Sequence, residues 1–435
     1  MSPTVPSNSE SRISAPAVRG EENTVLVAGA GIVGIASALW LQRAGFAVTL
    51  ADGNSPGSGA SSGNAGTIAT YGCVPINSPS ILRDLPRLMT TRHGPLRLDL
   101  AHALRNLTWT TSFLRNCTPT RVRHITRALG DLLSRTYAGY TPLIDAAEAH
   151  EFISSKDFLY CWEKEVNWDA AQRSLATRRA EGVAFDELTG DEIATLEPGI
   201  SLRFARGVRF TGGEHIVDPE GFARHLADYF TASGGELMRA NVARTDASAD
   251  HVAVQFADGT ARTFRQIVIT AGAHAHRIAG SGAEDLPLGT ERGYHLMFAD
   301  AANRVSRPVL WGERGFYATP MRNGLRIAGT VEIASLDAPP TPERLEALKD
   351  GAQRMFGDLG SPSATWLGFR PTMPDSLPVI GPSHRSPRIL FAFGHQHIGL
   401  TLAGITGRII ADLAADRRPN FDISAFAPTR FSGAR

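Results

Sequence analysis

A glycine-rich turn near the N-terminus carries residue types suited to binding a nucleotide. Gly29, Gly31 and Gly34 follow an apolar run at 24–28 and begin a segment with helical spacing. Glycines let the chain turn tightly and approach a pyrophosphate, and the helix N-terminus presents amides and partial positive charge to the phosphates. Asp52 ends a second apolar run about 20 residues later, where a carboxylate can hold ribose hydroxyls. The pattern predicts a βαβ unit that binds a dinucleotide, and a flavin or a nicotinamide cofactor would fit it.

The segment at 57–66 separates these two cofactors. Its polar members offer hydroxyl and amide groups, and its small members leave the backbone unobstructed. These residues are Ser61, Ser62, Asn64, Ala65 and Gly66. On composition alone, a flexible surface loop would look the same. The segment resembles the loop that follows the ADP-binding unit in the D-amino-acid oxidase superfamily, where small residues and an Asn line the flavin side of the pyrophosphate. The resemblance therefore implies FAD.

The resemblance extends over residues 24–415 and is to the D-amino-acid dehydrogenase branch of that superfamily. Its landmarks are AsnAlaGly at 64–66, ValAsnTrpAsp at 166–169, LeuGluProGly at 196–199, AspProGluGlyPhe at 218–222, ThrAlaGlyAla at 270–273 and ArgGlyTyrHis at 292–295. The most specific landmark is GlyPheArgProThrMetProAspSerLeuProValIleGly at 368–381, followed by GlyHis at 394–395 and GlyLeuThr at 399–401.

Within the longest of these motifs, Arg370 matches the arginine with which the superfamily grips the substrate carboxylate. A planar guanidinium can donate two parallel hydrogen bonds to a carboxylate, which orients the anion as well as attracting it. The segment at 399–401 begins the last helix, and similar segments bring backbone amides to the pyrimidine edge of the flavin. Those amides would stabilise the negative charge of reduced flavin. His395 and His397 flank the same turn, where a histidine can act in catalysis or simply cap and pack.

Tyr294, His295 and Tyr317 come from an expected antiparallel sheet that should roof the substrate. Tyrosine and histidine can hydrogen-bond an amine or a carboxylate and still form the wall of a cavity, and packing in the core is the alternative for each. Family members often have a smaller polar residue where His295 stands, so the resemblance also suggests another side chain or a cyclic imino acid as substrate.

These considerations define the predicted site. The predicted catalytic residues are Arg370, Tyr294, His295, Tyr317 and His395. The predicted cofactor-binding residues are Gly29, Gly31, Ile32, Val33, Gly34, Asp52, Ser61, Ser62, Asn64, Ala65, Gly66, Val242, Ala271, Gly272, Gly399, Leu400 and Thr401.

Neither a metal site nor a covalent flavin is expected. The three cysteines, Cys73, Cys117 and Cys161, are odd in number and lack CxxC spacing, which indicates neither a disulfide framework nor zinc. Some superfamily members tether FAD through Cys or His. Here the last cysteine precedes the C-terminal flavin-contact region, and no histidine precedes His93, so noncovalent FAD is expected.

The elements that must position these residues predict an α/β fold with two domains. We expect a disordered tail over 1–22 and a discontinuous, Rossmann-like FAD-binding domain over 23–75, 205–285 and 366–420. The substrate-binding domain should cover 76–204 and 286–365, with helices and a mostly antiparallel sheet. Expected elements include a helix at 218–234, strands at 236–242, 251–256, 263–270, 292–298, 315–321, 325–331 and 389–393, and a closing helix.

The composition excludes several classes of protein. The 435 residues include 44 Lys and Arg and 43 Asp and Glu, so no global field attracts nucleic acid or an anionic membrane. The N-terminus lacks the pattern of a secretory signal, and no run is long and apolar enough to span a bilayer. We expect a cytoplasmic protein with a small-molecule partner, and leave open peripheral contact with the inner face of the membrane.

The resemblance implies oxidation of a D-amino acid or cyclic imino acid, D-proline and hydroxy-D-proline being candidates. Hydride passes to flavin N5, and an acyclic imine product hydrolyses to a 2-oxo acid and ammonia. The electrons then reach O₂, a quinone or an electron-transfer protein. Two alternatives stay open: a glycine or sarcosine oxidase-like amine oxidase, and a nucleotide-binding module or flavin-bound assembly factor without turnover.

Overall fold

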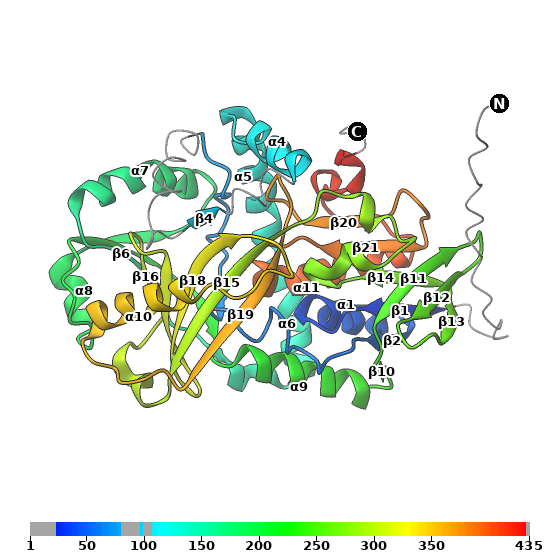
Figure 1. Ribbon diagram of the computed structural model, residues 1–435, viewed down its shortest axis with the longest axis horizontal. Helices are drawn as coiled ribbons and strands as arrows, with labels where there is room; N and C mark the ends of the chain where they lie inside the picture. The colour runs from blue at the N-terminus through cyan, green and yellow to red at the C-terminus, as the bar shows by residue number, and fades with distance from the viewer. Residues whose placement is uncertain (1–22, 80–95, 99–105, 432–435) are drawn as a thin grey trace, which may run out of the picture.

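The computed structural model describes residues 23–79, 96–98 and 106–431, and the expected tail over 1–22 lies outside them. The described chain forms two halves, one built on a largely parallel sheet and the other on a large, mostly antiparallel sheet (Figure 1). The α/β class expected from the sequence is therefore confirmed.

A six-stranded sheet forms the first half. In spatial order its strands are β10 (Glu236–Met238), β2 (Ala47–Ala51), β1 (Thr24–Ala28), β14 (Gln266–Ile269), β21 (Ile389–Phe393) and β20 (Val379–Pro382). All neighbours are parallel except β20, which runs antiparallel to β21. Strand β1 is apolar throughout because it is buried on both faces: Val25 and Val27 enter one core, while Leu26 and Ala28 enter another.

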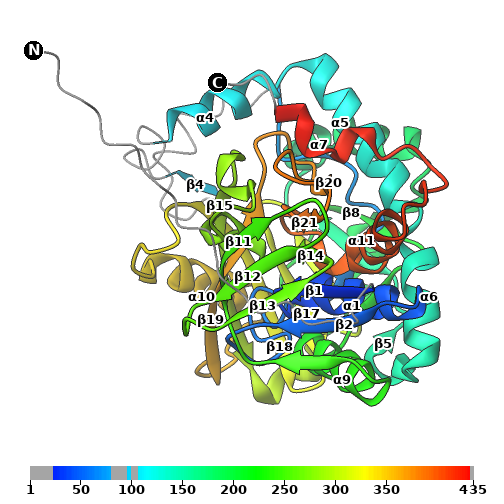
Figure 2. The same cartoon turned by 90° about the vertical axis from the view of Figure 1, so that its right-hand side faces the viewer.

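Helices cover one face of this sheet and a small sheet covers the other (Figure 2). The helices are α1 (Ile32–Arg43), α5 (Pro119–Leu133), α6 (Thr136–Ala146), α9 (Pro219–Ala232) and α11 (Gly399–Ala414), and the small sheet is β11 (Val242–Ala247), β12 (Val252–Phe256) and β13 (Ala261–Phe264). Helices α6 and α11 meet backbone to backbone, because a Cβ on Gly404 would lie 2.6 Å from the carbonyl carbon of Gly139.

A nine-stranded sheet forms the second half. Along its path run β19 (Ala364–Thr372), β15 (Gly289–Phe298), β18 (Gly324–Ile333), β17 (Phe316–Met321), β16 (Val309–Trp311), β6 (Phe158–Trp162), β8 (Arg206–Phe210) and β7 (Phe185–Thr189), and β4 (Leu96–Leu98) pairs with β18. The remaining elements are α4 (Leu107–Arg115), α7 (Glu165–Ala180), α8 (Gly190–Leu196), α10 (Pro342–Phe356) and a three-stranded sheet of β3 (Thr67–Ile68), β9 (Glu214–Ile216) and β5 (Ile153–Ser154).

Most expected elements form, with local differences. The expected helix at 218–234 is α9, whose first turn is capped by Asp218 through a 2.9 Å bond from the Gly221 amide. The expected strand at 263–270 is instead two strands, β13 and β14, which belong to different sheets and change over at Arg265. The expected strand at 236–242 stops at Met238, and Val242 begins the separate strand β11.

The sheets also suggest different domain boundaries. Strand β8 pairs with β6 and β7, and β19 pairs with β15, all within the nine-stranded sheet. The boundaries expected from the sequence place these strands in the FAD-binding segments 205–285 and 366–420. Helices α5 and α6 pack in the core beneath α1 and α11, although residues 76–204 were assigned to the substrate-binding domain. We therefore propose domain boundaries that follow the sheets and place α5 and α6 with the FAD-binding half.

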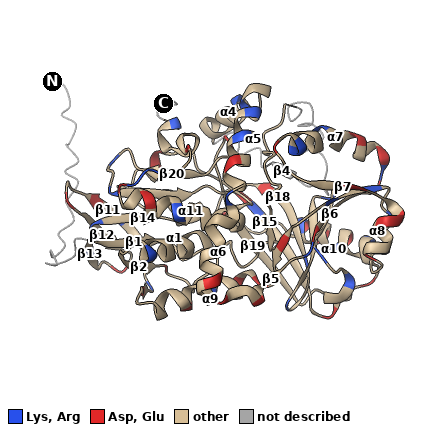
Figure 3. Cartoon of the chain, turned by 180° about the vertical axis from the view of Figure 1, so that it is seen from behind, with Lys and Arg blue, Asp and Glu red and all other residues tan. Residues whose placement is uncertain are grey.

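Charged residues of both signs are spread over both halves of the molecule (Figure 3). Among the described residues, no helix is long and apolar enough to cross a membrane.

Candidate active site

A cavity of about 1020 Å³ is lined by residues from both halves of the molecule. It reaches from Gly29 in the turn after β1 and Asp52 at the end of β2 to Arg370 on β19 and Tyr317 on β17. Most predicted site residues line it, although they come from segments far apart in the sequence. Those that do are Gly29, Gly31, Ile32, Val33, Asp52, Ser61, Asn64, Ala65, Val242, Ala271, Gly272, Tyr294, Tyr317, Arg370, His395, Gly399 and Leu400.

The glycine-rich turn at the first end of the cavity is shaped by close backbone contacts. Gly29 has a φ of 116°, and a Cβ there would lie 2.8 Å from the Thr270 carbonyl carbon. A Cβ on Gly34 would lie 1.8 Å from the Gly29 carbonyl oxygen. A Cβ on Gly31 would approach only Ser61 Oγ, at 3.5 Å. Gly34 therefore packs α1 against the turn without lining the cavity, while Gly31 leaves its backbone open toward it.

Asp52 stands directly after β2 and fixes the turn around it. Its Oδ2 accepts a 2.8 Å hydrogen bond from the Ala30 amide, and its Oδ1 accepts one of 2.8 Å from the Asn54 amide. Among the described residues that line the cavity, Asp52 is the one carboxylate. Both oxygens keep lone pairs that could accept ribose hydroxyls.

The loop at 57–66 is held against the start of α1. Ser61 Oγ accepts a 3.0 Å hydrogen bond from the Ile32 amide, and Asn64 Oδ1 accepts one of 2.8 Å from the Gly66 amide. The half-buried guanidinium of Arg326 donates to the carbonyl oxygens of Ser62 and Asn64. Ser62 and Gly66 do not line the cavity: the Ser62 hydroxyl donates within the loop to Gly59 O, 3.1 Å away.

The N-terminus of α11 borders the cavity, where Gly399 and Leu400 line it. Thr401 is turned away, and its Oγ1 accepts a 2.9 Å hydrogen bond from the Ala69 amide. The Leu400 carbonyl accepts a 2.5 Å hydrogen bond from the Tyr140 hydroxyl of α6. Thr401 therefore fixes the helix start to the segment after β3, and the first-turn amides of α11 are available to stabilise an anion.

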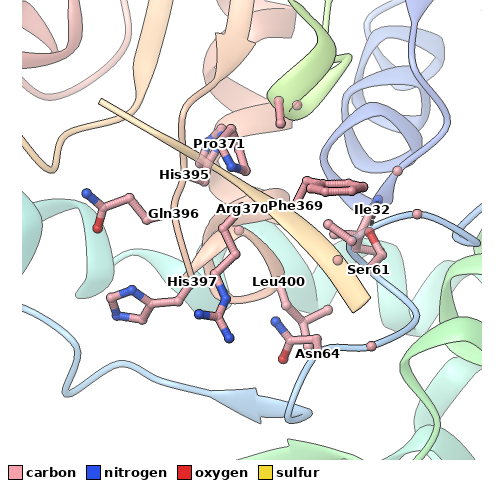
Figure 4. A pocket seen from close by; sticks show the side chains of 18 of the residues that line it. Ile32, Ser61, Asn64, Phe369, Arg370, Pro371, His395, Gln396, His397 and Leu400 are labelled. Atoms are coloured by element: carbon pink, nitrogen blue, oxygen red, sulfur yellow. Dashed lines mark hydrogen bonds between the residues drawn. The ribbon is translucent and has the colours of Figure 1, made fainter. Parts of the chain in front are cut away.

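Arg370 provides the cation at the second end of the cavity. Its Nη1 donates a 3.2 Å hydrogen bond to the Thr330 carbonyl, and the side chain lies over Gly293, where a Cβ would be 2.4 Å from Nη2. Figure 4 shows the guanidinium directed between His397 and Asn64. No carboxylate forms an ion pair with Arg370 in the described parts of the chain, and burial lowers its pKa while nearby Glu291 opposes that shift.

The two histidines of the turn before α11 face different surroundings. His395 is buried, and its Nε2 lies 3.0 Å from Thr406 Oγ1 of α11. His397 is exposed and lines the cavity beside Arg370 (Figure 4). Desolvation, together with the charges of Arg370 and Arg178, lowers the pKa of His397 below its ordinary value. His397 is therefore a neutral imidazole at neutral pH, and it is better placed than His395 to meet a substrate.

His295 is a correction to the expected roof, because its side chain does not line the cavity. The strand registers place His295 on the same face of the sheet as Arg370 and Tyr317, whereas Tyr294 points to the opposite face. On the shared face, Trp366 and the loop at 57–66 cover His295. His295 stacks on Trp366 at 5.2 Å between ring centroids, and its Nδ1 lies 3.3 Å from the Gly63 carbonyl. Its place in the structure is to support the loop at 57–66.

Tyr294 and Tyr317 line the cavity, but their hydroxyls already have protein partners. The Tyr294 hydroxyl donates to Glu332 Oε2 at 2.7 Å and accepts from the Thr341 amide at 3.0 Å. The Tyr317 hydroxyl lies 2.6 Å from that of Tyr160 and 3.1 Å from that of Tyr71. Burial raises the pKa of Tyr294 and Tyr317, so both stay neutral.

Sequence reasoning missed Tyr71, Tyr160 and Arg178, which line the same end of the cavity. Arg178 lies on α7, where its Nε donates to the Tyr71 carbonyl at 3.1 Å and its carbon Cζ lies 5.9 Å from the Tyr160 ring centroid. The only signals were weak ones: Tyr71 follows the predicted loop closely, and α7 contains the motif at 166–169.

Comparison with known proteins identifies the family. The model of the FAD dependent oxidoreductase family matches residues 24–413, which is most of the chain. This chain belongs to that family. The FAD-dependent oxidoreductase is also 33% identical over 419 residues to a protein named D-amino-acid oxidase from Bradyrhizobium diazoefficiens, covering 94% of this chain and 99% of the relative.

Solved structures share the fold of this FAD-dependent oxidoreductase. Glycine oxidase from Geobacillus kaustophilus matches with a TM-score of 0.72 and 20% identity, over 94% of this chain and 98% of that one. L-proline dehydrogenase from P. horikoshii matches with a TM-score of 0.69 and 17% identity, over 95% and 99% of the two chains.

The cavity of the FAD-dependent oxidoreductase fits its cofactor. The turn at Gly29 and Gly31 has no side chains to keep a pyrophosphate away, and Asp52 offers carboxylate acceptors beside the same turn. The first turn of α11 faces the same cavity further along. All three cysteines lie in the described part of the chain, are buried, and do not line the cavity.

Proposed function

We propose that this FAD-dependent oxidoreductase oxidises D-amino acids or cyclic D-imino acids, with D-proline and hydroxy-D-proline among its substrates. The observation that carries the proposal is Arg370, an arginine without an ion-pair partner among the described residues, in the cavity that continues from the nucleotide-binding turn. The relative named D-amino-acid oxidase supports the same substrate class. The comparisons themselves establish FAD-dependent oxidation of amino acids as the broader class.

The residues of this chain would bind and orient the substrate. Arg370 holds the carboxylate through the N–H groups that do not bond Thr330, and its position is fixed by Gly293 beneath it. When bound, FAD supplies the hydride acceptor. Neutral His397 and the first-turn amides of α11 border the site without a carboxylate that would compete for Arg370. No acid or base is required if the amine binds deprotonated, and the electrons then pass to O₂, a quinone or an electron-transfer protein.

An oxidase of small N-substituted amines is the second candidate function. The fold match to glycine oxidase favours it. Anaerobic bleaching of the flavin with D- and L-amino acids, D-proline, hydroxyproline isomers, glycine and sarcosine separates the two. We expect faster reduction by D-amino or D-imino acids than by their L-enantiomers. Faster reduction by glycine or sarcosine would select the second function, and a flavin that no amine bleaches would contradict both.

A further inference from the structure

The part of the cavity that faces Arg370 contains a second arginine, Arg178. Its Nε donates to the Tyr71 carbonyl at 3.1 Å, and its Nη1 donates to Ser174 O at 3.4 Å and to Ser174 Oγ at 3.2 Å. Nη2 has no hydrogen-bond partner, and no carboxylate forms an ion pair with Arg178, among the residues that the structure describes. Two N–H groups of this guanidinium are therefore available to a ligand in the cavity.

Three tyrosines stand beside Arg178 and add a further donor. The hydroxyls of Tyr71, Tyr317 and Tyr160 form a chain with two contacts, 3.1 Å and 2.6 Å long. Each hydroxyl has one proton to donate, and Tyr71 also interacts with Tyr160 and Thr67. An acceptor on a ligand can take one of these protons by replacing a contact within the cluster, and all three tyrosines line the cavity.

The charges in this region do not balance without a ligand. The positive charges of both Arg178 and Arg370 act on His397 and help to lower its pKa. The only carboxylate among the described lining residues, Asp52, is at the nucleotide end. Glu291 is buried beneath Arg370 without lining the cavity, and burial raises its pKa, which favours its neutral form. A substrate with one carboxylate would neutralise Arg370 and leave Arg178 unpaired.

We propose that Arg178, with Tyr71, Tyr160 and Tyr317, binds a second carboxylate of the substrate and so selects acidic amino acids. This inference rests on the proposed function, because it assumes that Arg370 binds the first carboxylate. The second carboxylate belongs either to the side chain, as in D-aspartate or D-glutamate, or to a substituent on nitrogen, as in iminodiacetate. Both place two anions on one small amine.

The test compares each acid with its closest uncharged counterpart by anaerobic rapid mixing. The pairs are D-glutamate with D-glutamine, D-aspartate with D-asparagine, and iminodiacetate with sarcosine. We expect at least one acid to reduce the flavin roughly 10-fold to 100-fold more efficiently than its counterpart, since a hydrogen bond to a charged group contributes that much. Arg178→Gln should abolish this preference, and Arg178→Lys should retain part of it. The pair that shows the preference identifies where the second carboxylate lies.

Arg179→Gln is the matched control, because Arg179 lies next in α7 but is exposed and pairs with Glu187 at the surface. It should leave the acid-to-neutral ratio unchanged. Binding is measured independently of turnover from the change in the flavin spectrum with glutarate and with pentanoate. Glutarate should bind more tightly in the wild type, and Arg178→Gln should remove the difference.

Equal efficiency for all pairs in the wild type, or a preference that survives Arg178→Gln, would overturn the inference while D-amino-acid oxidation stands. Reduction by none of these amines would overturn the proposed function. In that case, equal binding of glutarate and pentanoate would overturn the second carboxylate site as well, and tighter binding of glutarate that depends on Arg178 would support it.

Discussion

Glu291 and Arg370 are direct cross-strand partners in the β15–β19 ladder, yet their side chains do not form an ion pair. Glu291 is 2% exposed, and its Oε2 has no hydrogen-bond partner in the described structure. Burial raises the pKa of Glu291, while the Arg370 charge and a hydrogen bond involving Thr372 act in the opposite direction. A protonated Glu291 leaves the Arg370 charge free for the carboxylate of a substrate.

The affinity for simple carboxylates should therefore fall as the pH rises through the raised pKa of Glu291. Below that pKa Glu291 is neutral, and above it the ionised carboxylate competes with the ligand for Arg370. Titration of the flavin spectrum with propionate, which has no amine to titrate, should show the effect. Glu291→Gln should bind propionate with a flatter pH profile, and identical profiles for the two proteins would rule out this coupling.

The same group should affect folding. Its folded pKa lies above the ordinary glutamate value, so in that pH window the folded state binds more protons than the unfolded state. The free energy of unfolding should fall as the pH rises through the window. Urea unfolding over this range measures how the free energy of unfolding of wild type and of Glu291→Gln changes with pH. The contribution from ionisation of Glu291 should disappear below its pKa values in the folded and unfolded states.

Arg370→Lys should impair oxidation of amino acids strongly while leaving the flavin spectrum nearly intact. A guanidinium fixes two points of a carboxylate, whereas an ammonium allows the substrate to pivot. The lost bond should remove roughly 1.5–3 kcal/mol of binding, and misorientation can lower the reduction rate by about 100-fold. Rapid-reaction kinetics separates these effects. A carboxylate-free amine that loses as much as the amino acid would indicate a general amine oxidase instead.

Gly293→Ala should displace the same guanidinium without removing it. The added Cβ would lie 2.4 Å from Arg370 Nη2, so the side chain must shift. We expect weaker substrate binding, by roughly 10-fold from partial loss of a charged hydrogen bond. A Gly293→Ala protein that reduces with wild-type affinity would mean that Arg370 does not need this position.

Asp52→Ala should weaken retention of FAD more than it alters the chemistry in protein supplied with excess FAD. Asp52 lines the cavity beside the nucleotide-binding turn, whereas Arg370 lines the opposite end. Losing one charge-assisted hydrogen bond to the ribose should cost roughly 1.5–3 kcal/mol of FAD binding. The FAD dissociation constant measures the effect. Asp258→Ala removes an exposed carboxylate that bonds Thr260 in a remote turn and should retain FAD normally. Equal FAD dissociation constants for the wild type and Asp52→Ala would mean that Asp52 only stabilises the turn.

FAD should be released by acid or heat into the supernatant. The buried positions of Cys73, Cys117 and Cys161, away from the cavity lining, support noncovalent binding. Flavin absorbance that stays with the precipitated chain would contradict this expectation.

Local rules predicted the elements that border one end of the cavity. The turn at Gly29, the strand end at Asp52 and the helix at 399 depend on residues close in sequence, where glycine conformation and apolar periodicity are decisive. The burial of His295 could not be predicted locally, because it depends on contacts with Trp366 and Gly63, which lie far from it in the sequence. The cluster of Tyr71, Tyr160 and Arg178 depends on packing between three distant segments. The residue spacing within each segment does not predict it.

The close contact of α6 and α11 limits how this chain can be recombined with its relatives. A Cβ on Gly139 would lie 2.1 Å from the Ile405 amide nitrogen, and one on Gly404 would meet the Gly139 backbone. A side chain at either position would therefore clash with the backbone of the facing helix. A chimera that exchanges the segment containing α6 must keep glycine at position 139, even if every residue that lines the cavity is retained.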